Sequence, residues 1–459
     1  LNHSGAITLG NTINASGGTG TISINGSSIL DIDASVTAGT GGFSVNDSAT
    51  TIALNGSITS GSGGLLNFGD NPVVLESSKT IEAGGDGAII FGSSLNGDGD
   101  LDTLTITSGS GAVTFSGALG DSEGLGGVTI NSTSGNILFS SAIDDTNSRG
   151  TAIDINAGTG AVSLNGAVGA VTGIASLAID GTGITLADIG DSDTVGVLGA
   201  TLIDDGGTTI FNGTTYKSDS QTYNATTSHS IVGGGSSVSF STAGDTVFSG
   251  GGVLLSNGAD FSVNSSGGAI TVTEIQGDSD EDVVLNANGT LSVAAIGNGT
   301  GINDVSLTGG TVNLSGNIQT SNDGTDNGLI TVSGNAFAKT NLSIDSSDGG
   351  GVITFSDSID ADGSPRSLTL NSGTGNIDFD GAVGGADPLS SILITSAADV
   401  TFDSTVTTDG AFSQTTGSGT TTLTGAVSAA SYDLTTTTGV VISSTLSANS
   451  GGNVSLHSD

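Results

Sequence analysis

Two short acidic segments carry the residues best suited to bind a metal ion, NGDGDLD (96–102) and GDSDED (277–282). In each, carboxylates alternate with other residues, and such oxygen donors are those that Ca²⁺ prefers. The first segment lacks the Gly and the Glu that complete an EF-hand loop. We therefore expect a calcium site of another kind at either segment, with a plain polar turn as the alternative. The expected ligands are Asp98, Asp100 and Asp102 in the first segment and Asp278, Asp280 and Asp282 in the second.

A second group of residues combines types that are rare in this chain. The segment 214–235 contains Tyr216, Lys217, Tyr223 and His229, although the whole chain has only 3 Tyr, 3 His and 5 Lys plus Arg. We expect an irregular insertion or a distorted turn over 212–240, with these four side chains as binding contacts, because insertions in repeat proteins often bind ligands. The run QTYNATT inside it alternates like a strand, which favours the alternative without a binding role.

Acid–base and nucleophilic chemistry find little support. Adjacent carboxylates occur at Asp144–Asp145 and Asp204–Asp205, but no histidine motif accompanies either pair. The three histidines lie near the two ends and the middle of the chain, too far apart for a metal triad or a Ser-His-Asp site on stacked turns. We expect no catalytic residues. A polysaccharide-degrading β-helix enzyme remains the less favoured alternative. Such enzymes place Arg or Lys beside their carboxylates, and this chain has only 5 Lys plus Arg.

The elements that must position all these residues come from a repeat. A short pattern recurs about every 22 to 25 residues, as in Val113, Phe115 and Leu119. It consists of an apolar, a polar and an apolar residue, followed by three small or polar residues and one more apolar residue. Period-two alternation predicts short strands with one buried face. The apolar side chains of one such unit cannot close a core alone, so the units must stack.

The predicted fold is all-β, with almost no helix. We expect a single-stranded, right-handed parallel β-helix, or β-solenoid, of about 20 turns of roughly 19–25 residues. Equivalent positions then lie about 4.8 Å apart, with Phe above Phe and Ile above Ile. The content of 79 Gly against 3 Pro, and the regular apolar spacing, favour this fold over a disordered chain.

Turn residues follow the same period. Asn-Gly steps predict tight turns with positive φ. Thr107, Asn131, Asn156 and Asp180 follow the first inward pair of successive units. They predict either a stacked ladder of side chains at one corner or a simple turn preference.

Charge excludes several classes of partner. The chain has 45 Asp plus Glu against 5 Lys plus Arg, a net charge of -40. Nucleic acid and anionic membranes are therefore not expected as partners. No apolar run is long enough to span a membrane as a helix, and the chain contains no Cys to form disulfides.

We expect one continuous solenoid domain over 1–459, as a segment of a longer polypeptide. Because the repeat extends to both ends without an obvious polar cap, self-association, end to end or lateral, is also expected.

The units AGTGAVSLNGAV (157–168) and SGTGNIDFDGAVGGADPLSSILITS (372–396) resemble the repetitive regions of large secreted bacterial exoproteins. These are the filamentous haemagglutinin-like and autotransporter-like β-helical adhesins. The likeness extends over nearly all of the chain. It implies an extracellular or cell-surface rod without catalytic activity, acting as an adhesin stalk or as the subunit of a filament or sheath.

Two hypotheses follow. In one, the rod is a stalk or a calcium-stabilised adhesin that binds a cell-surface glycan or protein. In the other, it assembles into an extracellular fibre. The absence of Trp and the rarity of Tyr weaken glycan binding, since sugar sites usually use aromatic faces.

Overall fold

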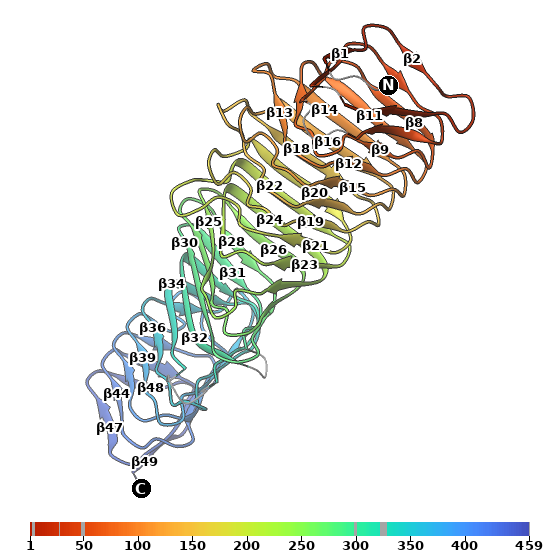
Figure 1. Cartoon of the computed structure of the whole chain (residues 1–459). Helices are drawn as coiled ribbons and strands as arrows, with labels where there is room; N and C mark the ends of the chain where they lie inside the picture. The colour runs from red at the N-terminus through yellow and green to blue at the C-terminus, as the bar shows by residue number, and fades with distance from the viewer. Residues whose placement is uncertain (2–4, 27, 47–50, 298–300, 322–327, 459) are drawn as a thin grey trace. The chain divides into compact units, whose positions relative to one another are not determined.

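The chain is an all-β parallel β-solenoid of about 19 turns. The computed structural model describes residues 1, 5–26, 28–46, 51–297, 301–321 and 328–458 (Figure 1). In this part of the chain the helical structure is one 3₁₀ turn, η1 (Asn449–Gly451), and no helix is long and apolar enough to cross a membrane. These findings confirm the predicted fold class; the right-handed sense of the coil stays a prediction.

The residues form two compact units, Leu1–His229 and Ser230–Asp459. Each is described by itself, and the expectation of one continuous domain stays a prediction.

The first unit is built from three parallel ladders, and each turn contributes one strand or bridge to each ladder. The first contains β1 (Ile7–Thr8), β4 (Ile29–Ile32), β7 (Thr51–Leu54), β10 (Val73–Leu75) and β13 (Leu95–Gly97), and continues through single bridges. The second contains β2 (Ile13–Asn14), β5 (Val36–Thr37), β8 (Ile58–Ser62), β11 (Lys79–Gly84), β14 (Thr103–Ser108), β16 (Gly127–Ser132), β18 (Ala152–Asn156), β20 (Ser176–Gly181), β22 (Val197–Asp205) and β24 (Thr215–Ile231). The third contains β3 (Thr21–Ile24), β6 (Gly42–Val45), β9 (Leu66–Asn67), β12 (Ile89–Phe91), β15 (Val113–Phe115), β17 (Ile137–Phe139), β19 (Val162–Leu164), β21 (Ile184–Leu186) and β23 (Thr208–Phe211).

The core of the first unit consists of columns of identical or similar side chains. Ile106, Ile130, Ile155 and Ile179 are direct partners on successive turns and are buried. Phenylalanine rings stack in the same way, and the ring of Phe115 lies 4.9 Å from that of Phe91 and 4.4 Å from that of Phe139. The predicted stacking of Ile on Ile and Phe on Phe is confirmed.

The second unit repeats the plan. Its first ladder contains β25 (Val238–Thr242), β27 (Phe261–Ser265), β30 (Glu281–Ala287), β32 (Ile302–Leu314), β34 (Ile330–Ala338), β36 (Ile353–Phe355), β39 (Ile377–Phe379), β41 (Val400–Phe402), β44 (Thr420–Leu423) and β47 (Gly439–Ile442). Its second contains β26 (Thr246–Leu255), β28 (Ile270–Val272), β31 (Thr290–Val293), the distal parts of β32 and β34, β37 (Ile359–Asp360), β42 (Val406–Thr407), β45 (Val427–Ala429) and β48 (Leu446–Ala448). Its third begins at the end of β26 and contains β29 (Ile275–Gln276), β33 (Ile318–Gln319), β35 (Leu342–Asp345), β38 (Ser367–Asn371), β40 (Ser391–Ser396), β43 (Ala411–Gln414), β46 (Ser431–Thr436) and β49 (Val454–Ser458).

The range 212–240, predicted as an irregular insertion or a distorted turn, is mostly strand. Residues 215–231 form β24, the longest strand among the described residues. Tyr216 pairs with Ile189 in the first ladder, and Tyr223 pairs with Ile203 in the second. Both tyrosines therefore occupy inward positions where other turns carry Leu, Val or Ile, which is why the spacing of the apolar pattern looked disturbed.

Asn-Gly steps serve two purposes. At Asn257–Gly258 both residues have positive φ, 60° and 68°, as the prediction required. At Asn165–Gly166, where φ is not positive, a Cβ on Gly166 would lie 2.1 Å from the backbone carbon of Ser141 on the preceding turn. There glycine is needed because stacked backbones approach closely, a reason that the turn prediction missed.

Candidate functional site

The candidate site is a shallow groove on the outer face of β18, β20, β22 and β24 in the first unit. The inward column here is Ile155, Ile179, Ile203 and Tyr223, so the neighbouring residues on each strand point outward. These neighbours form two rows, one on each side of the column. The rows are Asp154, Ala178, Leu202 and Thr222, and Asn156, Asp180, Asp204 and Asn224.

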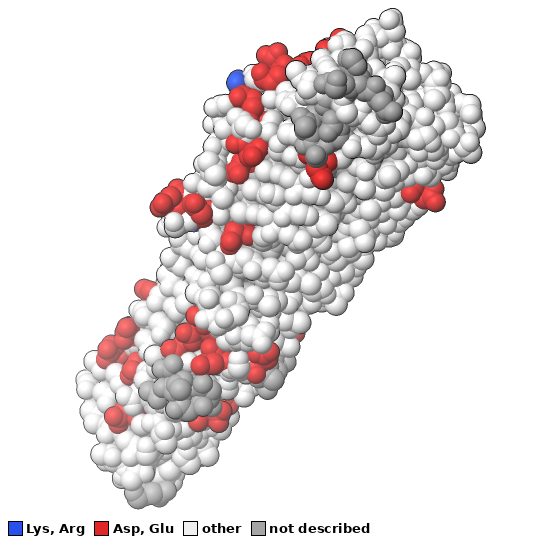
Figure 2. All heavy atoms as spheres, viewed as in Figure 1, with Lys and Arg blue, Asp and Glu red and all other residues white. Residues whose placement is uncertain are grey.

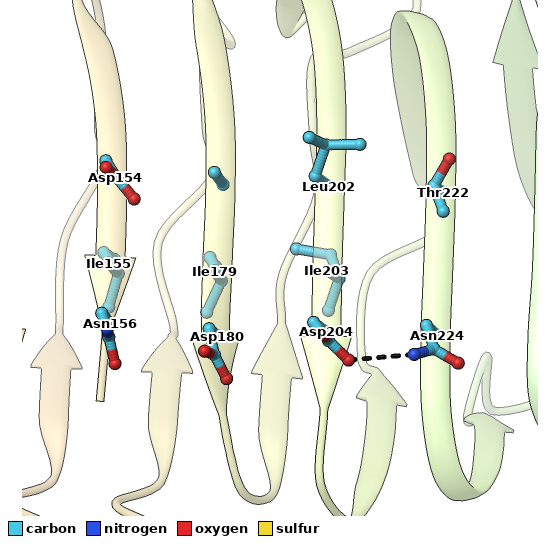
Figure 3. A pocket seen from close by; sticks show the side chains of 11 residues that line it. Asp154, Ile155, Asn156, Ile179, Asp180, Leu202, Ile203, Asp204, Thr222 and Asn224 are labelled. Atoms are coloured by element: carbon cyan, nitrogen blue, oxygen red, sulfur yellow. Dashed lines mark hydrogen bonds between the residues drawn. The ribbon is translucent and has the colours of Figure 1, made fainter. Parts of the chain in front are cut away.

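The groove has a volume of about 500 Å³ and is lined by both rows and the isoleucines between them (Figure 3). Asp180, Asp204 and Asn224 are exposed, and the amide nitrogen of Asn224 donates a hydrogen bond to Asp204 Oδ1 at 3.0 Å. The second row continues the predicted corner ladder, because Thr107, Asn131, Asn156 and Asp180 are partners on successive turns. The alignment behind that ladder is therefore confirmed.

The chemistry of the groove is that of a hydrogen-bond acceptor with negative charge. Asp180 and Asp204 lie on adjacent strands, about 4.8 Å apart at the backbone. No Lys or Arg is among the lining residues. Acidic side chains also gather in separate groups on the face shown in Figure 2. A groove that offers acceptor oxygens and negative charge favours ammonium or guanidinium groups and hydroxyl donors as ligands.

The pair Asp204–Asp205 cannot act as two cooperating carboxylates at this face. Asp204 is exposed, whereas Asp205 points inward and is fully buried. Each Asp205 oxygen accepts a backbone N–H of the preceding turn, from Gly183 and Ile184 at 2.8 Å each. Asp205 is therefore a structural acceptor that links two turns.

Both members of the pair Asp144–Asp145 are also structural acceptors. Asp144 Oδ1 accepts the backbone N–H groups of Val171 at 2.9 Å and Thr172 at 3.3 Å, one turn later. Burial raises the pKa of Asp144, although these two hydrogen bonds oppose the rise. Asp145 accepts three backbone N–H groups and the Thr151 hydroxyl from its own loop.

The first predicted calcium segment does bring its carboxylates together. Asp98, Asp100 and Asp102 each offer an oxygen within 4.8 Å of the others. Asp98 Oδ1 accepts the Asp100 N–H at 3.1 Å, and Asp102 Oδ1 accepts the Ser78 hydroxyl at 3.2 Å. The arrangement is compatible with a divalent cation.

A similar cluster joins residues that are distant in the sequence. Asp31, Asp33 and Glu76 also have oxygens within 4.8 Å of one another. The pKa of Asp31 is raised mainly by burial and also by the charge of Asp33. The pKa of Glu76 is raised mainly by burial and also by the charges of Asp31, Asp33 and Asp98. The pairing of turns brings these residues together: Ile32 and Leu54 are partners, as are Leu54 and Leu75, which aligns Asp33 with Glu76.

The second predicted calcium segment is arranged differently. Asp278, Asp280 and Asp282 do not form a comparable cluster among the described residues. Asp278 Oδ1 accepts the Asn257 N–H at 3.0 Å, and Asp282 Oδ1 accepts the Asp304 N–H at the same distance, so these oxygens bind different turns. The buried Glu281 accepts the N–H groups of Asp278 and Ser279.

Three of the four residues predicted as binding contacts are core residues. Tyr216, Tyr223 and His229 are fully buried. The rings of Tyr216 and Tyr223 meet Phe211 edge to face at 5.1 and 4.9 Å. Burial raises the pKa of both tyrosines far above the usual range. Their rarity marked a change in core packing and not a surface for ligands.

Lys217 is half-buried, and its Nζ donates to the Ser192 carbonyl at 2.7 Å, which holds the neighbouring loop. Of the remaining histidines, His3 lies outside the described residues, and His457 Nε2 lies 3.5 Å from Asp433 Oδ1.

Comparisons of the chain with models of protein families, with curated proteins and with solved structures found no match.

Proposed function

We propose that this chain is a non-catalytic extracellular structural protein, a β-solenoid that serves as an adhesin stalk or as the subunit of a surface filament. The proposal combines the solenoid fold with the resemblance to filamentous haemagglutinin-like and autotransporter-like exoproteins described above.

The observation that carries the proposal is the unbroken stacking of turns within each unit. In the second unit, the rings of Phe355, Phe379 and Phe402 stack at 5.0 and 4.7 Å, and their strands pair in register. A stack in which every turn is hydrogen-bonded to the next extends by repetition and presents its outer faces at fixed intervals. These are the mechanical properties that a stalk or fibre requires.

The charge and composition support a role outside the cell. With a net charge of -40 and no Cys, the chain resists aggregation by repulsion and needs no disulfide to fold. Turns can be added one after another to a growing end as the chain emerges, because each turn contacts mainly its neighbours.

The carboxylates support a non-catalytic role. The two adjacent Asp pairs provide acceptors for backbone N–H groups, and the lining of the groove offers no cation beside its carboxylates. A polysaccharide-cleaving enzyme would need acid and base groups facing one another across a substrate.

Electron microscopy of the negatively stained, purified chain over a concentration series tests the structural role. About 19 turns at about 4.8 Å each predict particles on the order of 90 Å in contour length. Elongated particles of this length, or filaments of many such lengths, are expected. Compact globules would contradict the proposal. Protease treatment of intact cells that produce the protein tests the location, since a surface protein is degraded while the cells remain closed.

A second candidate function is a calcium-stabilised adhesin that binds a glycan or a protein. The convergence of Asp98, Asp100 and Asp102 favours the calcium part of this proposal, and the open groove over β18–β24 favours a binding face. Glycan arrays with and without Ca²⁺ test it, because an adhesin of this kind loses binding when the ion is removed.

A further inference from the structure

An exposed apolar patch lies next to the groove in the first unit. Val171, Val195, Leu198 and Leu202 are 74%, 43%, 60% and 49% exposed, although each is a large apolar side chain. All four come from adjacent turns of the solenoid, on β22 and the loops beside it. Single exposed apolar residues are common, but four of them on adjacent turns form a candidate interaction surface.

The loops that carry Val171 and Val195 meet beside Leu198, and Leu202 lies farther along the same strand. Leu198 N–H donates to the Ile174 carbonyl at 2.8 Å, which aligns β22 with the loop that follows Val171. A Cβ on Gly173 would lie 3.2 Å from the Leu198 side chain and 2.2 Å from the Val195 carbonyl oxygen. Leu202 follows Leu198 on the same strand and lines the groove itself.

The patch is held in place before any partner arrives. Asp144 accepts the N–H groups of Val171 and Thr172, and Asp191 accepts those of Asp193 and Thr194 at 2.7 Å each. Lys217 bonds the Ser192 carbonyl in the same loop. A preorganised apolar surface loses little conformational entropy on binding, which favours affinity.

Carboxylates border the patch on two sides. Asp180 and Asp204 are exposed along the groove beside Leu202, and Asp191 and Asp193 are exposed in the loop before Val195. The ammonium group of Lys217 is engaged by that loop. The surface therefore combines apolar anchors with a negative border.

We propose that this face binds a segment of another protein in which apolar side chains are flanked by Lys or Arg. The apolar residues of the segment cover Leu198, Leu202 and the two valines, and its cations meet Asp180 and Asp204. Charge complementarity favours a basic partner over a second copy of this chain at this face, because the chain carries only 5 Lys plus Arg against 45 Asp plus Glu. The inference does not depend on the stalk function.

The test uses the purified chain and a short fluorescent peptide in which lysine and leucine alternate. A lysine–serine peptide reports charge alone, and a glutamate–leucine peptide reports apolar contact alone. We expect measurable binding of the lysine–leucine peptide that weakens as salt is added, and binding at least about tenfold weaker for both control peptides. Equal affinity for the lysine–leucine and lysine–serine peptides would overturn the proposal, because any linear polyamine would then satisfy the groove.

Variants locate the binding. The double change Leu198→Ser and Leu202→Ser should weaken binding of the lysine–leucine peptide by about tenfold or more. Asp180→Asn with Asp204→Asn should weaken it several-fold and reduce its dependence on salt. The matched control is Leu254→Ser with Val284→Ser, which removes comparably exposed side chains from the second unit and should leave the affinity unchanged. A control variant that loses as much affinity as the patch variant would refute the site.

Methyl NMR of the unaltered chain provides a readout that does not depend on the variants folding. Addition of the lysine–leucine peptide should shift the methyl signals of Val171, Val195, Leu198 and Leu202. Shifts confined to other residues would place the binding elsewhere and overturn the proposal.

Discussion

The Oδ1 atom of Asp282 accepts a hydrogen bond at 3.0 Å from the backbone N–H of Asp304, one turn later in the solenoid. Asp260 does the same for Asp282 at 3.1 Å, and Asp304 does so for Leu329 at 2.6 Å. Three successive carboxylates thus act as acceptors at a corner. Asn317 and Asn341 accept the N–H groups of Ser343 and Ser367 at an equivalent separation. Asp and Asn can both fill this role because each side chain offers an acceptor oxygen.

This ladder leads to a prediction about Asp282. Asp282→Ala should lower the free energy of unfolding by about 1 to 3 kcal/mol, because the N–H of Asp304 loses its acceptor. Asp282→Asn keeps an acceptor, removes one of three neighbouring negative charges, and should stay within about 0.5 kcal/mol of the unaltered chain. Urea denaturation measures both. Equal losses in the two variants would show that the charge, and not the acceptor, is what matters.

The stability of the fold should rise as the pH falls from neutral towards about 4.5. Four carboxyl groups have a pKa above the ordinary value of 3.8 for Asp or 4.5 for Glu, and burial is the main cause. They are Asp31, Glu76, Asp144 and Asp378. In the window between the ordinary and the raised pKa the folded state binds more protons than the unfolded state. The stabilisation that these four groups give to the folded state is therefore greatest at the acidic side of the window. It is lost as the pH rises through the window.

Two carboxylates with lowered pKa values oppose this trend at lower pH. Backbone hydrogen bonds from Asp193 and Thr194 lower the pKa of Asp191, and the hydrogen bond from Arg366 lowers that of Asp362. Their contribution is present above about 3.8 and is lost below it. Calorimetry should therefore find the highest Tm between about pH 4 and 5, and Glu76→Gln should flatten the acidic rise. A Tm that falls steadily from pH 7 downward would contradict this assignment.

The phenylalanine stack should be the most sensitive part of the first unit. Phe115→Ala removes a buried ring that contacts rings above and below it, and should cost about 3 to 5 kcal/mol. Leu254→Ala, at a position that is 39% exposed, should cost less than about 0.5 kcal/mol. Denaturant melts of both variants give the comparison. A loss of similar size at both positions would mean that stability does not come from the stacked core.

Calcium should stabilise the first unit through Asp98, Asp100 and Asp102. Binding to the folded state alone adds about 1.4 kcal/mol when the ion is at roughly ten times its Kd. Asp98→Asn with Asp102→Asn should abolish the rise in Tm, whereas Asp278→Asn should leave it intact because that oxygen binds a backbone N–H. Mg²⁺ is the comparison ion. The calcium proposal would fail if Ca²⁺ left the Tm of the unaltered chain unchanged.

The exposed apolar residues of β47 and β49 should promote self-association of the purified chain. Among the described residues, β47, β48 and β49 pair only with the turn before them. Ile442, Val454 and Leu456 are 38%, 49% and 43% exposed, whereas their partners Leu423, Tyr432 and Leu434 are buried. Open strand edges with apolar faces promote association. A second copy of the chain can cover these apolar side chains.

Sedimentation velocity over a concentration series measures this association. The unaltered chain should sediment faster as its concentration rises, and Ile442→Asp with Leu456→Asp should remain a monomer. Val284→Asp is the control, because Val284 is comparably exposed but lies on an internal turn. Association that persists unchanged in the double variant would place the contact elsewhere.

Much of the fold was predictable because it depends on a local period. Alternation around Val113 and Phe115 is enough to define a strand with one buried face, and its recurrence forces stacking of like on like. Where a turn substitutes Tyr for Leu or Ile, as at Tyr216 and Tyr223, the pattern is hidden although both residues still pair with inward residues of the preceding turn. The segment was therefore mistaken for an insertion, and its aromatic residues for surface contacts.

The sequence by itself determined the all-β solenoid, its repeat, its stacked core and its acidic surface, since these depend on residue types at a regular spacing. Only the tertiary structure decided which carboxylates serve the fold and which face solvent, because a shift of one residue, as from Asp204 to Asp205, moves a side chain from one side of a strand to the other. It also decided which distant residues meet. Asp31 and Glu76, or Ile174 and Leu198, become neighbours through the pairing of turns, and no local pattern specifies that register.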